Sequence, residues 1–141
     1  MGLCDYHFET DYNKAYDNIA DSFYLPCMRN SVRYDRISGY FGSTIYIIAW
    51  TALKDFVSNG GKMRIICSPC ISEDDMKALQ EGYSSKSSSI LMKSIKQEID
   101  DLFSLDYLQS PSRVLACLVA EGIIDLKIAV PSTNNDPDIK R

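Results

Sequence analysis

Histidine is nearly absent from this 141-residue sequence, in which His7 is the single example. One histidine close to the N-terminus does not indicate a general acid–base pair, and we predict no catalytic residue within the chain. His7 and the five cysteines have no spacing typical of metal ligands. We therefore expect no metal site and no cofactor.

Long hydrophobic runs are also missing. The longest one, residues 45–53, is interrupted by Tyr46, Trp50 and Thr51 and is far shorter than the roughly 20 residues that span a bilayer. The N-terminus carries acidic residues and lacks the apolar segment of a signal peptide. These absences predict a cytoplasmic protein with no membrane partner.

Neither sign of charge dominates. Lysine and arginine number 15 against 19 aspartate and glutamate residues, for a formal net charge of −4, so contact with nucleic acid would need a local basic patch. Hydrophobic residues make up 45% and charged residues 24%, as in a soluble globular protein. At this length we expect one domain at residues 14–131, between a mobile N-terminus (1–13) and a polar tail or loop (132–141).

Three segments are rich in apolar or β-branched residues and end beside glycine or proline: 32–41, 62–68 and 123–130. A helical pattern separates the first two, which therefore form a βαβ unit with parallel strands and a right-handed crossover. The sequence predicts an α/β fold with a parallel-stranded sheet of at least three strands, flanked by helices.

Apolar spacing and end signals predict five helices. Pro26 should bend or restart the first, and Asn59-Gly60-Gly61 should end the second, which is apolar on most sides and is expected to be well buried. Ser72 with Asp75 resembles a capping box at the start of the third, and Ser110-Pro111 begins the last. The expected ranges are 14–30, 44–58, 72–82, 89–108 and 112–121.

Ligands of open parallel sheets bind beyond the carboxyl ends of the strands. There, Ser43 and Thr44 could bind an anion at a helix start, or could simply cap that helix. Arg33 and Arg36 beside Asp35 could recognise phosphate, or could only form surface ion pairs. Both alternatives stay open for each group. The candidate substrate-binding residues at this edge are Arg36, Ser38, Tyr40, Ser43 and Ser68.

The spacing of two cysteines suggests a different function for the carboxyl ends of the strands. Cys67 and Cys70 have the spacing of a redox dithiol and lie between a strand and a helix, which would fit a thiol oxidoreductase. The five cysteines are odd in number and scattered, however, which favours reduced thiols that pack as small buried hydrophobes.

Several motifs, in this order and spacing, resemble those of one family. They are FYLPCM (23–28), SVRYDRISGYF (31–41), NGGKMRIICSP (59–69), SEDD (72–75), EGY (81–83) and DLKIAV (125–130). They are similar to the N-terminal half of the phospholipase D-like nuclease domain that is fused to DEAD/DEAH-type helicases in bacterial restriction and phage-defence proteins. The resemblance extends over residues 16–130 and implies half of a phospholipase D-like fold.

This resemblance implies a chemistry that the chain cannot complete. The family joins two H-x-K motifs by pairing two domains or two chains, with one histidine forming a phosphohistidine, a second acting as general acid, and lysine holding the phosphate without a required metal. His7 lacks a lysine two positions later, and the family's motif is expected after the strand at 123–130. The catalytic motif is thus expected outside this chain, in a longer protein or a natural partner.

Two hypotheses of different classes remain. In the first, the chain is the N-terminal portion of a phospholipase D-like phosphodiesterase or nuclease module that acts on nucleic acid with a helicase partner and is inactive alone. In the second, it is a non-catalytic interaction or scaffold domain of a defence or DNA-processing complex. Expected partners are nucleic acid, a helicase domain or subunit, and a second copy or second phospholipase D-like half. A half-sheet should also expose an apolar edge and associate.

Overall fold

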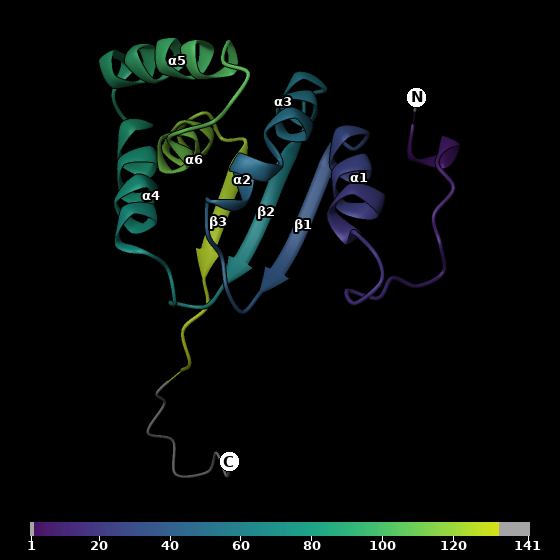
Figure 1. The fold of residues 1–141 in the computed structure, drawn as a ribbon. Helices are drawn as coiled ribbons and strands as arrows, with labels where there is room; N and C mark the ends of the chain where they lie inside the picture. The colour runs from purple at the N-terminus through teal and green to yellow at the C-terminus, as the bar shows by residue number, and fades with distance from the viewer. Residues whose placement is uncertain (1, 133–141) are drawn as a thin grey trace, which may run out of the picture.

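The structure is a computed structural model that describes residues 2–132. A parallel sheet with the strand order β1-β2-β3 forms its centre (Figure 1). The strands are β1 (Arg33–Ser38), β2 (Lys62–Cys67) and β3 (Ile124–Ile128). Both neighbouring pairs are parallel, and Met63 of β2 lies between Tyr34 and Ile124. The predicted α/β fold and its three parallel strands are confirmed, although each strand is shorter than the sequence suggested.

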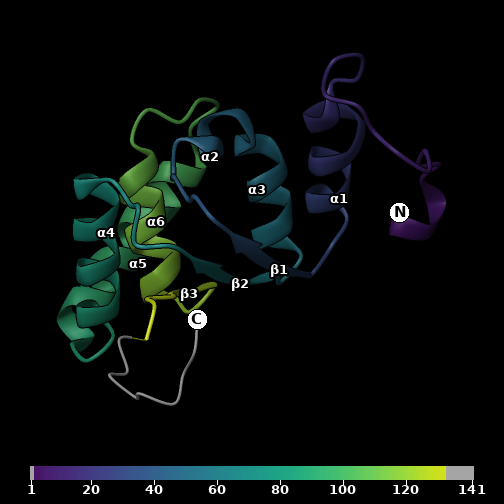
Figure 2. The same ribbon diagram turned by 90° about the horizontal axis from the view of Figure 1, so that it is seen from below.

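Helices cover one face of this sheet. Seen from below, α2, α3 and α6 lie on the upper side of the strands, and α4 and α5 lie beside α6 at the β3 end (Figure 2). Residues that point toward the helices are buried, among them Met63, Ile65 and Leu126, and alternate residues point the other way into solvent. Successive crossovers of the same hand that move in one direction across a sheet place their helices on the same face. The strand order therefore explains why the second face is bare.

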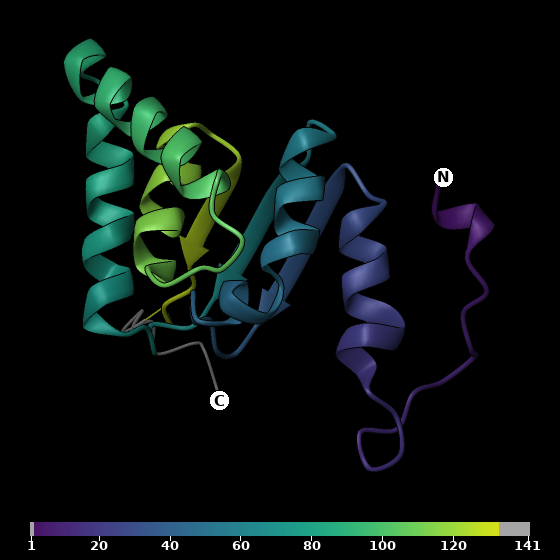
Figure 3. The ribbon, with the colours of Figure 1, turned by 45° about the horizontal axis from the view of Figure 1, so that its top comes forward.

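The helical elements follow the expected order, with different bounds. They are a 3-10 helix (Leu3–Asp5), a π-helix (Ala20–Tyr24), α1 (Leu25–Arg29), α2 (Ile45–Ile48), α3 (Trp50–Ser58), α4 (Glu73–Ser85), α5 (Ser89–Phe103) and α6 (Pro111–Ala120). The innermost is α6, whose residues 114–120 are all buried, and it runs beside α4 (Figure 3). None of these described helices is long and apolar enough to cross a bilayer.

The prediction for the first helix was wrong at its start. The expected helix at 14–30 is replaced by a turn and then by the π-helix and α1. The side chain of Asn13 accepts a hydrogen bond from the backbone of Ala15, and that of Asn18 accepts one from Asp21. The bond of Asn13 belongs to the preceding turn and competes with helical backbone bonds, whereas Asn18 caps the helical segment through Asp21 N–H, so that segment begins only after residue 18. Pro26 sits in the first turn of α1, where its missing N–H costs little.

The expected single helix at 44–58 is divided into α2 and α3. Ala49 interrupts it with a backbone φ of −87° and ψ of 9°, outside the helical region. The expectation of a helix buried on most sides holds for α3, but it is wrong for α2, because Ile45, Ile47 and Ile48 are exposed. Thr44 precedes α2 and makes no side-chain capping bond.

Both glycine-terminated helices end as the sequence predicted. Gly60 has a φ of 79° and Gly122 one of 73°, a left-handed conformation that glycine adopts without strain. After α3, Gly61 N–H donates to Phe56 and Gly60 N–H to Val57. This pair of bonds defines a Schellman motif, and α6 ends with the same pair.

Gly82 is a different case, and the expected end of the third helix there was wrong. The helix continues to Ser85, with Gly82 buried inside it. A Cβ atom at Gly82 would lie 2.7 Å from the carbonyl oxygen of Ala116 and 2.9 Å from Cβ of Val119. Glycine is therefore required because α4 and α6 approach closely. Two other expected boundaries also shift. The fourth helix, expected to end at 108, stops at Phe103 as α5, and the last, expected to start at 112, begins at Pro111 as α6.

One free edge of the sheet is partly closed. The hydroxyl of Tyr83, from α4, accepts a hydrogen bond of 2.8 Å from Leu126 N–H and donates one of 3.0 Å to Leu126 C=O. Both bonds occupy groups that an added strand would need. These bonds concern only the β3 edge: β1 forms the other edge of the sheet, and the outer face carries no helix of residues 2–132. The predicted mobility of residues 1–13 stays a prediction.

Candidate functional site at the carboxyl ends of the strands

The three strands end at one rim of the molecule (Figure 1). Here the structure brings together four of the five candidate binding residues. Arg36 donates to Ser38 Oγ at 3.4 Å, and Ser38 Oγ in turn bonds both the C=O and the N–H of Tyr40. Ser68 Oγ, at the end of β2, donates to the C=O of Gly39. These bonds link the ends of β1 and β2 into one polar corner.

The hydroxyls at this corner have structural partners. Ser38 and Ser68 each donate to a main-chain carbonyl oxygen, which fixes the turn after β1. Tyr40 is exposed, and its ring lies over Gly42, where an added Cβ would be 3.1 Å from Tyr40 Oη. The corner therefore offers an exposed phenol and the guanidinium of Arg36 to solvent, whereas its serines already hold the backbone. Substrate binding by these residues stays a prediction.

Ser43 lies apart from the other candidates. It is buried, and it donates to Asp75 twice: its N–H to Oδ2 at 2.8 Å and its Oγ to Oδ1 at 2.5 Å. The side chain of Ser43 is directed to α4, so it does not cap α2 and is not free to bind an external anion. An open depression of about 330 Å³, lined by polar residues, lies beside this bond.

Asp75 is the residue that sequence reasoning missed. The Ser72–Asp75 pattern predicted a capping box, and half of it is present, since Ser72 Oγ accepts from Asp75 N–H at 3.2 Å. The carboxylate of Asp75 bonds Ser43 instead of returning to Ser72. The spacing from Ser72 singles out Asp75, but nothing local in the sequence indicates its bonds to Ser43, because Ser43 lies 32 residues away.

Charged residues gather on the outer face next to the rim. Arg64 donates two bonds to Asp35, at 2.8 and 2.7 Å, and Arg33 donates a third at 2.9 Å. The hydrogen bond from Arg64, with help from Arg33, lowers the pKa of Asp35 to about 2. Arg33 and Asp35 thus form the surface ion pair that was the simpler alternative, and Arg36 does not take part in it.

The dithiol alternative finds little support at this rim. Cys67 is buried and Cys70 is exposed, and both are free thiols. Burial raises the pKa of the Cys67 thiol, whereas a redox-active cysteine needs a stabilised thiolate. Among residues 2–132, no group of three or more His, Cys, Asp or Glu side chains could hold a metal ion.

Comparison of the chain with protein-family models, with curated proteins and with solved structures found no match in any of the three. The resemblance to phospholipase D-like domains therefore depends on the sequence motifs alone. In the structure, these motifs lie at identifiable places in the fold. The segments 31–41 and 59–69 form β1, β2 and the polar corner, and EGY supplies both the glycine of the α4–α6 contact and the tyrosine at the β3 edge.

Proposed function

We propose that this chain is the N-terminal, non-catalytic part of a phospholipase D-like phosphodiesterase or nuclease module. It supplies the sheet and one wall of the active site, and a second unit supplies the H-x-K motifs. The module acts on nucleic acid together with a helicase domain or subunit in a restriction or phage-defence system. The chain by itself has no phosphodiesterase activity.

The observation that carries this proposal is the bare outer face of the sheet. Parallel sheets are almost always covered on both faces, because their strands are built for burial. Here Ile37 and Ile66 are exposed on the uncovered face, between the charged residues of β1, β2 and β3. A second unit packed on this face would complete the usual layers and would also lie next to the rim. The family's pairing of two halves is one way to provide it.

Activity of the purified chain and of its native complex tests the proposal. The chain alone should not hydrolyse bis(p-nitrophenyl) phosphate or labelled DNA. When the chain is tagged in its own cells, cross-linked and purified, the bound polypeptide should contain H-x-K, and the complex should cleave the same substrates. Replacing that histidine with alanine should abolish cleavage. Activity of the isolated chain, or a partner without the motif in an inactive complex, would contradict the proposal.

A second candidate is a non-catalytic interaction domain, and a specific observation favours it. The serines of the rim are used for internal bonds, and α2 exposes Ile45, Ile47 and Ile48 near Arg36 and Tyr40. Exposed apolar side chains that are gathered in one place are typical of protein-binding surfaces. The same purification separates the two candidates, since a scaffold would bring down partners without phosphodiesterase activity.

A further inference from the structure

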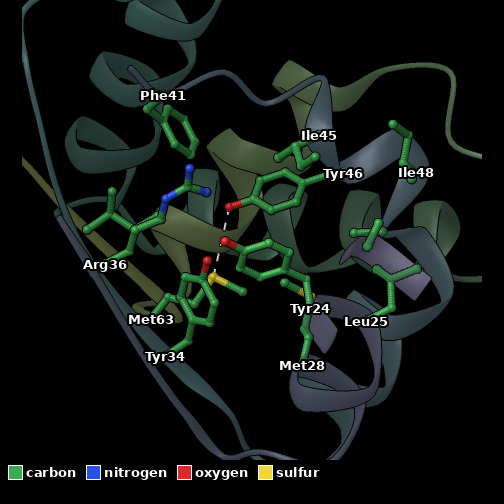
Figure 4. Close-up of a pocket in the computed structure, with 13 residues that line it drawn as sticks. Tyr24, Leu25, Met28, Tyr34, Arg36, Phe41, Ile45, Tyr46, Ile48 and Met63 are labelled. Atoms are coloured by element: carbon green, nitrogen blue, oxygen red, sulfur yellow. Dashed lines mark hydrogen bonds between the residues drawn. The ribbon is translucent and has the colours of Figure 1, made fainter. Parts of the chain in front are cut away.

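A pocket of about 190 Å³ lies on the helix side of the sheet, away from the outer face. Its walls come from the π-helix, α1, β1, the β1–α2 segment, α2 and β2 (Figure 4). Apolar side chains make up most of the lining, including Leu25, Met28, Ile45, Met63 and Ile65. An engineered cavity of about 150 Å³ holds a benzene ring, so this space accepts one ring or a short alkyl chain.

Polar groups converge at one side of this pocket. Figure 4 shows the phenol oxygens of Tyr24, Tyr34 and Tyr46 pointing toward one another, with the guanidinium of Arg36 beside them. Tyr46 is buried, and its hydroxyl lies 3.9 Å from Met63 Sδ. The hydroxyls of Tyr24 and Tyr34 make no hydrogen bond with any other residue of the described range 2–132. Two phenol donors are therefore available to a ligand.

Arg36 differs from the other arginines of the described range. Arg29, Arg33, Arg64 and Arg113 each form an ion pair with a carboxylate. Arg36 has no carboxylate partner within residues 2–132, and its bond to Ser38 Oγ is long, at 3.4 Å. The guanidinium of Arg36 and the hydroxyls of Tyr24 and Tyr34 therefore gather hydrogen-bond donors beside an apolar pocket, and no carboxylate within residues 2–132 accepts from Arg36. Carboxylates are the acceptors that match the two parallel N–H groups of one arginine.

From this arrangement we propose that the pocket binds a small amphipathic monocarboxylate. Its carboxylate accepts hydrogen bonds from Arg36, Tyr24 and Tyr34, and its ring or alkyl chain lies against Leu25, Met28 and Ile65. A single negative charge matches Arg36, the one cationic residue of the described range that lines this pocket, so a monocarboxylate fits better than a phosphate dianion. This ligand site shares Arg36 with the polar corner of the rim, but its other lining residues differ and it does not depend on the proposed nuclease function.

Titrations followed by two-dimensional NMR test this site with three probes: phenylacetate, hexanoate and the neutral analogue phenylacetamide. Phenylacetate or hexanoate should cause saturable shifts at Tyr24, Tyr34, Tyr46 and Met63 at millimolar concentration. Which of the two binds more tightly distinguishes a ring from an alkyl chain. Phenylacetamide should bind at least about tenfold more weakly than phenylacetate, because it lacks the charge that Arg36 recognises.

Arg36→Gln provides the decisive variant, and Arg33→Gln on the same strand is its matched control. Arg36→Gln should weaken phenylacetate binding about tenfold or more and leave phenylacetamide binding unchanged, whereas Arg33→Gln should change neither. Tyr24→Phe and Tyr34→Phe keep the rings and should each weaken carboxylate binding several-fold. Absence of saturable shifts with either carboxylate, shifts located elsewhere, or equal binding by Arg36→Gln and Arg33→Gln would overturn the proposal.

Discussion

Asp75 is the one buried charged side chain in the part of the chain that the structure describes. A buried carboxylate is costly unless hydrogen bonds compensate its lost hydration. Ser43 supplies two such bonds, from its main chain and from its hydroxyl. This single pair joins the start of α2 to the first turn of α4, and so it holds together two of the loops that follow the strands.

Removing this carboxylate should destabilise the fold. We expect Asp75→Ala to lower the free energy of unfolding by about 3 kcal/mol, because the charge-assisted bonds are lost and Ser43 N–H is left buried without an acceptor. Urea denaturation measures the change. Asp74→Ala is the matched control, since Asp74 is exposed in the same helical turn, and it should cost at most about 1 kcal/mol. Equal effects of the two substitutions would show that the Ser43–Asp75 bonds contribute little.

Single residues were the hardest part of the fold to predict from sequence. Four of the candidate residues, Arg36, Ser38, Tyr40 and Ser68, lie together at the rim, while their role in binding stays a prediction. The direction of each side chain was not predictable, because it depends on partners from other elements. No local sequence pattern indicates that Ser43 bonds a residue of another helix. Nor does any indicate that Asp35 forms ion pairs with Arg33 and Arg64 while Arg36 forms none within residues 2–132.

At the scale of elements, α4 and α6 form the closest helix contact. Gly82 permits it, because any side chain there would meet the backbone of Ala116 and the side chain of Val119. Arg113 at the start of α6 adds bonds to Glu98 of α5 and to Glu81 of α4. The helical layer on the β3 side is therefore fixed by both close packing and a shared arginine.

Gly82→Ala tests the importance of close packing. In an exposed helix this change would stabilise by up to about 1 kcal/mol through helix propensity. Here the added Cβ must displace backbone, so we expect a loss of about 1–3 kcal/mol in the free energy of unfolding. Ser84→Ala, at an exposed position of α4, should change it by no more than about 0.5 kcal/mol. Stabilisation by Gly82→Ala in the same urea titration would contradict the close approach.

The sequence predicted which elements exist better than where each one ends. Strands and Schellman ends carry local signals, namely β-branched runs and glycines at 60 and 122, and these predictions were correct. Gly82 resembles a glycine that ends a helix, but it lies inside α4 and allows α6 to pack closely against that helix. The start of the first helix depends on the side-chain bonds of Asn13 and Asn18, and the break at Ala49 is a departure of the backbone from helical angles; apolar periodicity registers neither.

For the molecule as a whole, the distribution of its helices is the main feature. The helices that pack on the sheet cover one face of it (Figure 2). The other face exposes Ile37 and Ile66 among the charged residues of three strands. The β3 edge is less available, because Tyr83 occupies both backbone groups of Leu126. Association of this chain is therefore expected through the outer face of the sheet rather than through its β3 edge. The open apolar edge expected from the sequence stays a prediction, because Tyr83 occupies only the β3 edge and β1 forms the other edge of the sheet.

Substituting the two exposed isoleucines tests this mode of association. Ile37 is 86% exposed and Ile66 is 42% exposed, so Ile37→Thr with Ile66→Thr keeps β-branched residues and removes apolar surface that is already hydrated. Stability of the isolated chain should change by less than about 1 kcal/mol. Sedimentation velocity should show concentration-dependent association of the natural chain and a monomer for the double variant, while Ile90→Thr on α5, a position that is 80% exposed, should associate normally. A natural chain that stays monomeric at every concentration, or a double variant that still associates, would mean that self-association does not use this face.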